Sequence, residues 1–137
     1  MAFTINPDDH EPIFSQIVNE VVFGILRGVW REGEQIPSRR EMAERLRVNP
    51  NTVLAAYRQL ESLGVAEVRR GLGLFVSEGG VEKSKKLTAQ ILKKRFGDLL
   101  ALARRAGLTD EEISAMLNEL AGKSAGGASN IRRERGE

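Results

Sequence analysis

Cysteine is absent from this 137-residue chain, and histidine occurs once, at position 10. Without thiols the chain can form neither disulfide bonds nor thiolate metal sites. The acids beside His10, at positions 8, 9 and 11, are interpreted more simply as a solvated approach to the first helix than as part of a catalytic cluster. A phosphate-binding loop of the form GxxxxGKS or GxxxxGKT is also missing. We therefore expect no enzymatic activity, no metal and no cofactor.

Long hydrophobic runs are missing as well. No apolar stretch approaches the roughly 20 residues that a membrane-spanning helix requires. The first residues, MAFTINPDDHEP, carry acids where a secretory signal would carry basic side chains. These two absences predict a cytoplasmic protein with no membrane partner.

The chain also lacks a marked excess of positive charge. Its formal net charge is +2, and residues 1–80 combine nine arginines with eleven acids, a net charge of −2. Residues 81–137 carry twelve basic residues and eight acids, a net charge of +4. A uniformly basic surface is therefore excluded. If the chain binds nucleic acid, it must use individual arginines at defined positions.

Helical periodicity is what the chain has in abundance. Apolar residues recur in pairs four positions apart from Ile13 to Trp30, which predicts an amphipathic helix of about 18 residues that stops near Gly33. The pair Gly24 and Gly28 inside this segment is interpreted as a place of close packing, since the surrounding charges argue against a membrane helix.

Residues 38–64, SRREMAERLRVNPNTVLAAYRQLESLG, contain two helix starts joined by a short turn. Ser38 and Glu41 have the spacing of a capping box, in which the hydroxyl and the carboxylate each accept a hydrogen bond from an unpaired amide. Asn49 is a favoured N-cap, and Pro50 fits the first helical position because no hydrogen bond is lost there. The segment therefore predicts two short helices at a defined angle.

The second of these helices has two distinct faces. Its core face is expected to carry Val53, Ala56, Tyr57 and Leu60. The opposite face has polar and small residues, namely Asn51, Thr52, Ala55, Arg58 and Gln59.

Residues 65–76, VAEVRRGLGLFV, have the alternation and the glycine-rich centre of a β-hairpin. The order of these elements is one helix, a tight pair of helices and a hairpin. This order predicts a winged helix-turn-helix domain, which we place at residues 1–80. The predicted fold class is mainly α with a small β-hairpin. In such domains the second helix of the pair enters a major groove of DNA.

The remaining residues predict a helical segment at 81–121, after a polar joint at 77–86. An apolar stripe runs from Leu87 to Ala106, and Thr109 with Glu112 forms a second capping box before a last helix. Two short helices cannot bury both stripes against each other, so we expect a homodimer. The residues expected at its contact are Leu92, Phe96, Leu99, Ala103, Met116 and Leu120.

Residues 122–137 are rich in Gly, Ser and Arg and are predicted to be a disordered tail.

Taken together, GEQIPSRREMAERLRVNPNTVLAAYRQLESLGVAEVRRGLGLFV is similar to the DNA-binding domain of GntR-type bacterial transcription regulators. The resemblance covers about residues 11–77. The short helical part that follows resembles the YtrA-like subgroup, in which such a part serves dimerisation. The resemblance implies a homodimeric regulator of transcription, most simply a repressor, bound to double-stranded operator DNA.

The resemblance also implies which residues meet the DNA. The candidates lie in the two helices and at the tip of the hairpin, residues 70–73, which would reach the minor groove; they are Arg40, Asn49, Pro50, Asn51, Thr52, Arg58, Arg70 and Gly71. Arg58 is interpreted equally well as a solvated surface charge. Two positions depart from the family pattern: Ala55 stands where arginine is frequent, and Leu74 where threonine is frequent. We expect the operator to differ from those of close relatives.

A winged-helix module that binds protein instead of DNA is the alternative function, because the fold does not determine what is bound. The polar third helix favours DNA, since a protein-binding surface would expose an apolar patch there. An inverted-repeat operator is expected from the dimer. The sequence identifies neither the operator, nor the target genes, nor a small-molecule effector, and Arg69 could face either side of the hairpin.

Overall fold

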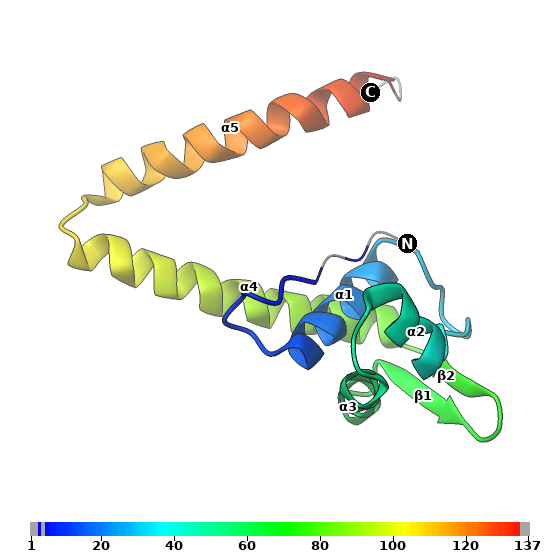
Figure 1. Cartoon of the computed structure of the whole chain (residues 1–137). Coiled ribbons are helices and arrows are strands. Elements are labelled where there is room, and N and C mark those ends of the chain that lie inside the picture. Colours follow the sequence, from blue (N-terminus) through cyan, green and yellow to red (C-terminus); the bar gives the residue numbers. More distant parts are fainter. Residues whose placement is uncertain (1–2, 4, 135–137) are drawn as a thin grey trace. The chain divides into compact units, whose positions relative to one another are not determined.

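The computed structural model describes residue 3 and residues 5–134, with side chains as far as 123. Three helices, a hairpin and two longer helices follow one another along the chain (Figure 1). They are α1 (Ile13–Leu26), α2 (Arg39–Leu46), α3 (Pro50–Ser62), β1 (Ala66–Arg69), β2 (Gly73–Val76), α4 (Gly80–Arg105) and α5 (Asp110–Glu134). The predicted fold class, mainly α with a small hairpin, is confirmed.

The chain divides into two compact units, residues 1–91 and 92–137, and the division falls inside α4. In the first unit α1, α2, α3 and the hairpin enclose one hydrophobic core. Fully buried members come from three helices and from β2; they include Ile17 and Val21 of α1, Met42 of α2, Val53 and Leu60 of α3, and Val76 of β2. The predicted inner face of α3 is therefore confirmed.

Helix α1 ends at Leu26, earlier than the periodicity predicts. Gly28 adopts a left-handed φ of +80°, and the Val29 amide bonds back to the Gly24 carbonyl at 2.8 Å. The chain then folds back so that Trp30 packs on Gly24, where a Cβ atom would lie 2.7 Å from the ring. Trp30 belongs to the core but not to the helix, which explains why the apolar pattern outlasts the helix.

Strands β1 and β2 pair in antiparallel fashion, with Ala66 opposite Val76 and Arg69 opposite Gly73. The segment 33–36, for which the sequence analysis predicts no strand, lies along the other edge of β2. The Gly33 amide donates to the Val76 carbonyl at 2.9 Å, and the Ile36 amide donates to the Leu74 carbonyl at 2.8 Å. The hairpin is thus held on both sides at its base.

Helix α4 begins at Gly80, so the prediction of a polar joint at 77–86 was wrong for most of that range. The charged residues of this stretch are exposed, whereas Ser84 is fully buried. Gly80 lies so close to the hairpin that a Cβ atom would be 2.8 Å from the Val65 carbonyl oxygen. Composition misled here because a helix with one narrow buried face has a mostly polar sequence.

In the second unit α4 ends before Gly107, whose φ is +88°. The predicted capping box of α5 is present in both directions: the Thr109 amide donates to Glu112 Oε1 at 3.1 Å, and the Glu112 amide donates to Thr109 Oγ1 at 3.2 Å. Helix α5 continues to Glu134, through most of the segment that composition predicts to be disordered. Elongation of an existing helix adds one hydrogen bond per ordered residue, a gain that composition does not capture. Residues 135–137 of that segment lie outside the described residues.

Candidate nucleic-acid interface

The turn between α2 and α3 is built from two local signals. The Ser38 hydroxyl accepts a hydrogen bond from the Glu41 amide at 3.1 Å, which caps the start of α2 as predicted. Arg47 then adopts a left-handed conformation, with φ of 56° and ψ of 49°, and the Val48 amide bonds back to Ala43 at 3.1 Å. This compact reversal brings α3 against α2 only three residues after α2 ends.

Helix α3 begins at the predicted residue pair. The Asn49 side chain accepts a hydrogen bond from the Asn51 amide at 2.8 Å, and Pro50 occupies the first helical position. Because the Asn49 oxygen serves as the cap, that oxygen is already bonded within the chain. The amide NH₂ group of Asn49 takes no part in this bond and is a donor that suits a phosphate oxygen of DNA.

The outward face of α3 is polar. Asn51, Arg58 and Gln59 are exposed together with Ala55, and Thr52 is half-buried. Val53, Ala56 and Leu60 are fully buried on the opposite side. The candidate base-reading residues are thus held on a helix whose other face is anchored in the core.

Tyr57 fixes α3 in a second way that the sequence did not reveal. Its ring is buried, and its hydroxyl donates to the Pro37 carbonyl at 2.5 Å. Burial, more than the nearby carboxylate of Glu41, raises the pKa of the Tyr57 phenol, so it remains a donor at any ordinary pH. The periodicity predicted a core position for Tyr57, but the partner comes from a loop twenty residues earlier.

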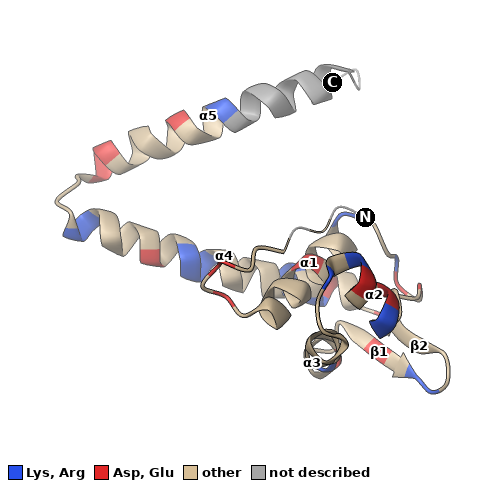
Figure 2. Cartoon of the chain, viewed as in Figure 1, with Lys and Arg blue, Asp and Glu red and all other residues tan. Residues whose placement is uncertain are grey.

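Helix α2 contributes charges of both signs to this part of the molecule (Figure 2). Arg40 is exposed, as its predicted role requires. Arg45 lies 3.8 Å from Glu41 in an exposed ion pair, which favours the surface-charge interpretation for that arginine.

Basic residues lie where β1 passes into the hairpin loop, a stretch drawn in blue in Figure 2. The Leu72 amide donates to the Arg69 carbonyl at 2.9 Å, and Gly71 between them has a φ of +78°. This tight turn leaves the side chain of Arg70 exposed. We call residues 70–73 the wing tip.

Arg69 faces the side of the hairpin that carries Glu67 and Phe75, because it contacts both residues. Its guanidinium lies 4.2 Å from the ring centroid of Phe75, and it forms an ion pair with Glu67 at 3.2 Å. Both arginines are exposed, but these two contacts hold Arg69 across the hairpin.

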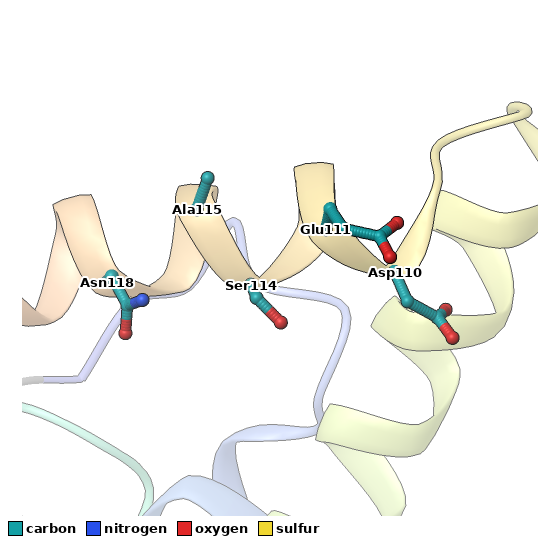
Figure 3. Close-up of a pocket in the computed structure, with 5 residues that line it drawn as sticks. All are labelled: Asp110, Glu111, Ser114, Ala115 and Asn118. Atoms are coloured by element: carbon teal, nitrogen blue, oxygen red, sulfur yellow. The ribbon is translucent and has the colours of Figure 1, made fainter.

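A shallow pocket elsewhere is lined by five residues of α5 alone: Asp110, Glu111, Ser114, Ala115 and Asn118 (Figure 3). Its acidic rim is the opposite of what a phosphate backbone would need. Within the part of the chain that the structure describes, no group of three or more His, Cys, Asp or Glu side chains could hold a metal ion. Over the same residues, no helix combines the length and the hydrophobicity of a membrane-spanning segment.

A polar helix anchored on α2, with a β-hairpin wing beside it, defines a winged helix-turn-helix protein. Residues 14–76 match the family described as bacterial regulatory proteins, gntR family. The chain is 32% identical to the HTH-type transcriptional repressor YtrA of Bacillus subtilis (strain 168), over 92% of this chain and 97% of that protein. It belongs to the gntR family of DNA-binding transcription regulators, which also confirms that it is not an enzyme.

Solved structures agree with this assignment. A GntR family transcriptional regulator from Listeria monocytogenes superposes with a TM-score of 0.73 at 30% identity, covering 82% of this chain and 97% of that one. The AraR DNA-binding domain in complex with operator ORX1 is 25% identical, with a TM-score of 0.50, and covers 54% of this chain and 92% of that domain.

Proposed function

We propose that this protein is a cytoplasmic, homodimeric repressor that binds an inverted-repeat operator. In this proposal α3 enters the major groove and the wing tip meets the adjacent minor groove. The observation that carries it is the outward face of α3, where Asn51, Arg58 and Gln59 are exposed on a helix anchored by buried residues.

The side chains on this face have the chemistry of base readout. An asparagine can pair with both N6 and N7 of adenine, and an arginine can pair with O6 and N7 of guanine or with a phosphate. The amides in the first turn of α3 favour a phosphate at the same place. Arg40 and Arg70 would add backbone contacts on either side, with Pro50, Thr52 and Gly71 allowing close approach.

The alternative, a winged helix that binds protein, would require an apolar surface on α3. The exposed residues of that helix are polar or small instead. The bound operator of the AraR domain supports the DNA-binding role, since that domain shares the winged fold.

The homodimer is supported by the second unit. Seven large apolar residues of α4 and α5 are between 45% and 61% exposed in the single chain; they are Leu92, Phe96, Leu99, Leu102, Met116, Leu117 and Leu120. A stripe of this size in water favours association, and a second copy of the same helices would cover it in a two-fold arrangement. Ala103, between Leu99 and Ala106 on the stripe, would let the helices approach.

The role as a repressor is supported by the relative from Bacillus subtilis, which is named as one and aligns along nearly its whole length. A small-molecule effector is compatible with this role, but the α5 pocket is an open surface with two carboxylates and we assign it no ligand.

Selection of DNA from a random pool, followed by footprinting, tests the proposal. We expect an enriched sequence with two inverted half-sites, centred one or more helical turns of about 34 Å apart. Direct repeats would contradict the two-fold dimer. Recovery of no preferred sequence, with binding to protein partners instead, would support the alternative function.

A further inference from the structure

We infer that Gln35 is a positioning residue for DNA binding, because its side chain holds the wing tip in the conformation that presents Arg70. This inference rests on the proposed function. It concerns a residue outside α2, α3 and the hairpin, in the short segment 33–36 that runs along β2.

The main-chain hydrogen bonds of this segment stop short of the wing tip. They join Gly33 and Glu34 to Val76, and Ile36 to Leu74. Gln35 is paired with Phe75 in this antiparallel register, so the residue opposite Leu72 would be Ser38. Ser38 is unable to continue the ladder, because the chain turns away at Pro37 and Ser38 becomes the N-cap of α2.

The side chain of Gln35 takes over at this point. Its Nε2 atom donates to the Leu72 carbonyl at 2.6 Å, across 37 residues of sequence. The Leu72 amide is bonded to the Arg69 carbonyl, so both main-chain polar groups of Leu72 are occupied. The turn that contains Arg70 is therefore closed by one bond within the hairpin and one from outside it.

The backbone of Gly73 is shaped to admit this contact. A Cβ atom at position 73 would lie 2.7 Å from Gln35 Nε2, and the φ of +125° is one that other residues rarely adopt. The close approach of the amide group thus depends on glycine at this position.

Pro37, the residue that follows this segment, also anchors α3, since its carbonyl accepts the hydrogen bond from the Tyr57 hydroxyl. Gln35 and Pro37 thereby connect the wing tip and the proposed recognition helix through two residues of one loop. A hairpin tip bonded in this way loses less conformational freedom when DNA binds, which strengthens binding without a new contact.

The variant Gln35→Met tests the inference, because it keeps the length of the side chain and removes the donor. On the DNA recovered by the selection above, we expect binding to weaken about fivefold, as for the loss of one hydrogen bond. In an Arg70→Ala background the same substitution should change the affinity by less than about twofold, because the tip then has no arginine to position. Hydrogen exchange at the Leu72 amide should become faster in both backgrounds.

The variant Gln90→Met is the matched control, since Gln90 is an exposed glutamine on α4, and it should leave DNA binding unchanged. Thermal unfolding of each variant separates positioning from a general loss of stability.

Equal losses of affinity with and without Arg70, or no loss in the wild-type background, would overturn the inference. If Arg70→Ala alone has no effect while Asn51→Ala does, the wing contact fails and the inference with it, but major-groove binding stands. If the wild-type protein selects no DNA, the proposed function itself fails.

Discussion

The two units of this chain use their apolar residues in opposite ways. In the first, Ile17, Val53 and Leu60 are completely buried within one chain. In the second, Phe96 and Leu99 are 59% and 61% exposed although their spacing is as regular as that of any core helix. Amphipathic periodicity therefore identifies a face that will be covered, without saying whether the same chain or another one covers it. The first unit has the buried core of an independently folding domain. The second has the exposed apolar stripe of an interface.

The largest change, a loss in the free energy of unfolding, is expected from a cavity in the first unit. Leu60→Ala removes a fully buried side chain of α3 and should lower the free energy of unfolding by about 2–5 kcal/mol. Trp30, the only tryptophan, is buried in the same core, so its fluorescence during urea denaturation reports on this unit. The control Leu120→Ala, exposed in the single chain, should shift that transition by no more than about 0.5 kcal/mol when the protein is dilute enough to be monomeric. A similar shift for both variants would remove the contrast between the units.

Charges placed in the stripe of α4 should break the proposed dimer. The double variant Phe96→Asp and Leu99→Asp would bury two carboxylates at the contact, and we expect monomers by sedimentation and operator binding weaker by about 100-fold or more. Ser114→Asp with Asn118→Asp adds the same charge to the polar side of α5 and should leave the dimer intact.

A truncated chain without the second unit also tests the proposed dimer contact. The family resemblance ends near residue 77, but Gly80 and Ser84 of α4 are buried in the first unit, so the cut belongs after Ile91. The fragment should fold as a monomer. If it sediments as a dimer, the contact lies in the first unit instead.

The contact of Asn51 with a base should be independent of the core of the first unit and of the proposed dimer contact. Asn51→Ala should weaken operator binding by about 1–3 kcal/mol and binding to random DNA much less, with sedimentation and stability unchanged. Asn118→Ala, an exposed asparagine of α5, is the control. An equal loss on both DNAs would identify Asn51 as a phosphate contact.

The smallest effect is expected at the wing tip. Arg70→Ala should weaken binding to all sequences and reduce the slope of log K against log salt by about 1, because one phosphate contact is lost. Arg104→Ala, whose side chain pairs with Asp110 at 3.5 Å in the second unit, should leave the slope unchanged. An unchanged slope for Arg70→Ala would exclude the wing tip from the interface.

Features encoded by neighbouring residues were predictable. Ser38, Asn49 and Thr109 each cap a helix at the expected position, because an N-cap bonds to amides two or three residues away. The wing turn followed from its glycines, since Gly71 and Gly73 both adopt positive φ values that the turn requires. The candidate DNA-contacting residues came from the family resemblance, and their roles remain predictions.

Features that join distant residues were not predictable in this way. The end of α1 depends on Trp30 folding back onto Gly24, and the start of α4 depends on Gly80 packing against Val65. The bonds from Gln35 to the wing tip and from Tyr57 to Pro37 have no signal in the spacing of either partner. Local hydrogen bonding and amphipathic period were enough to locate most helix starts and the hairpin, because their partners lie within a few residues. Only the folded chain decided where α1 stops, which polar residues of α4 are buried and what holds the wing, because those contacts exist only once the core has formed.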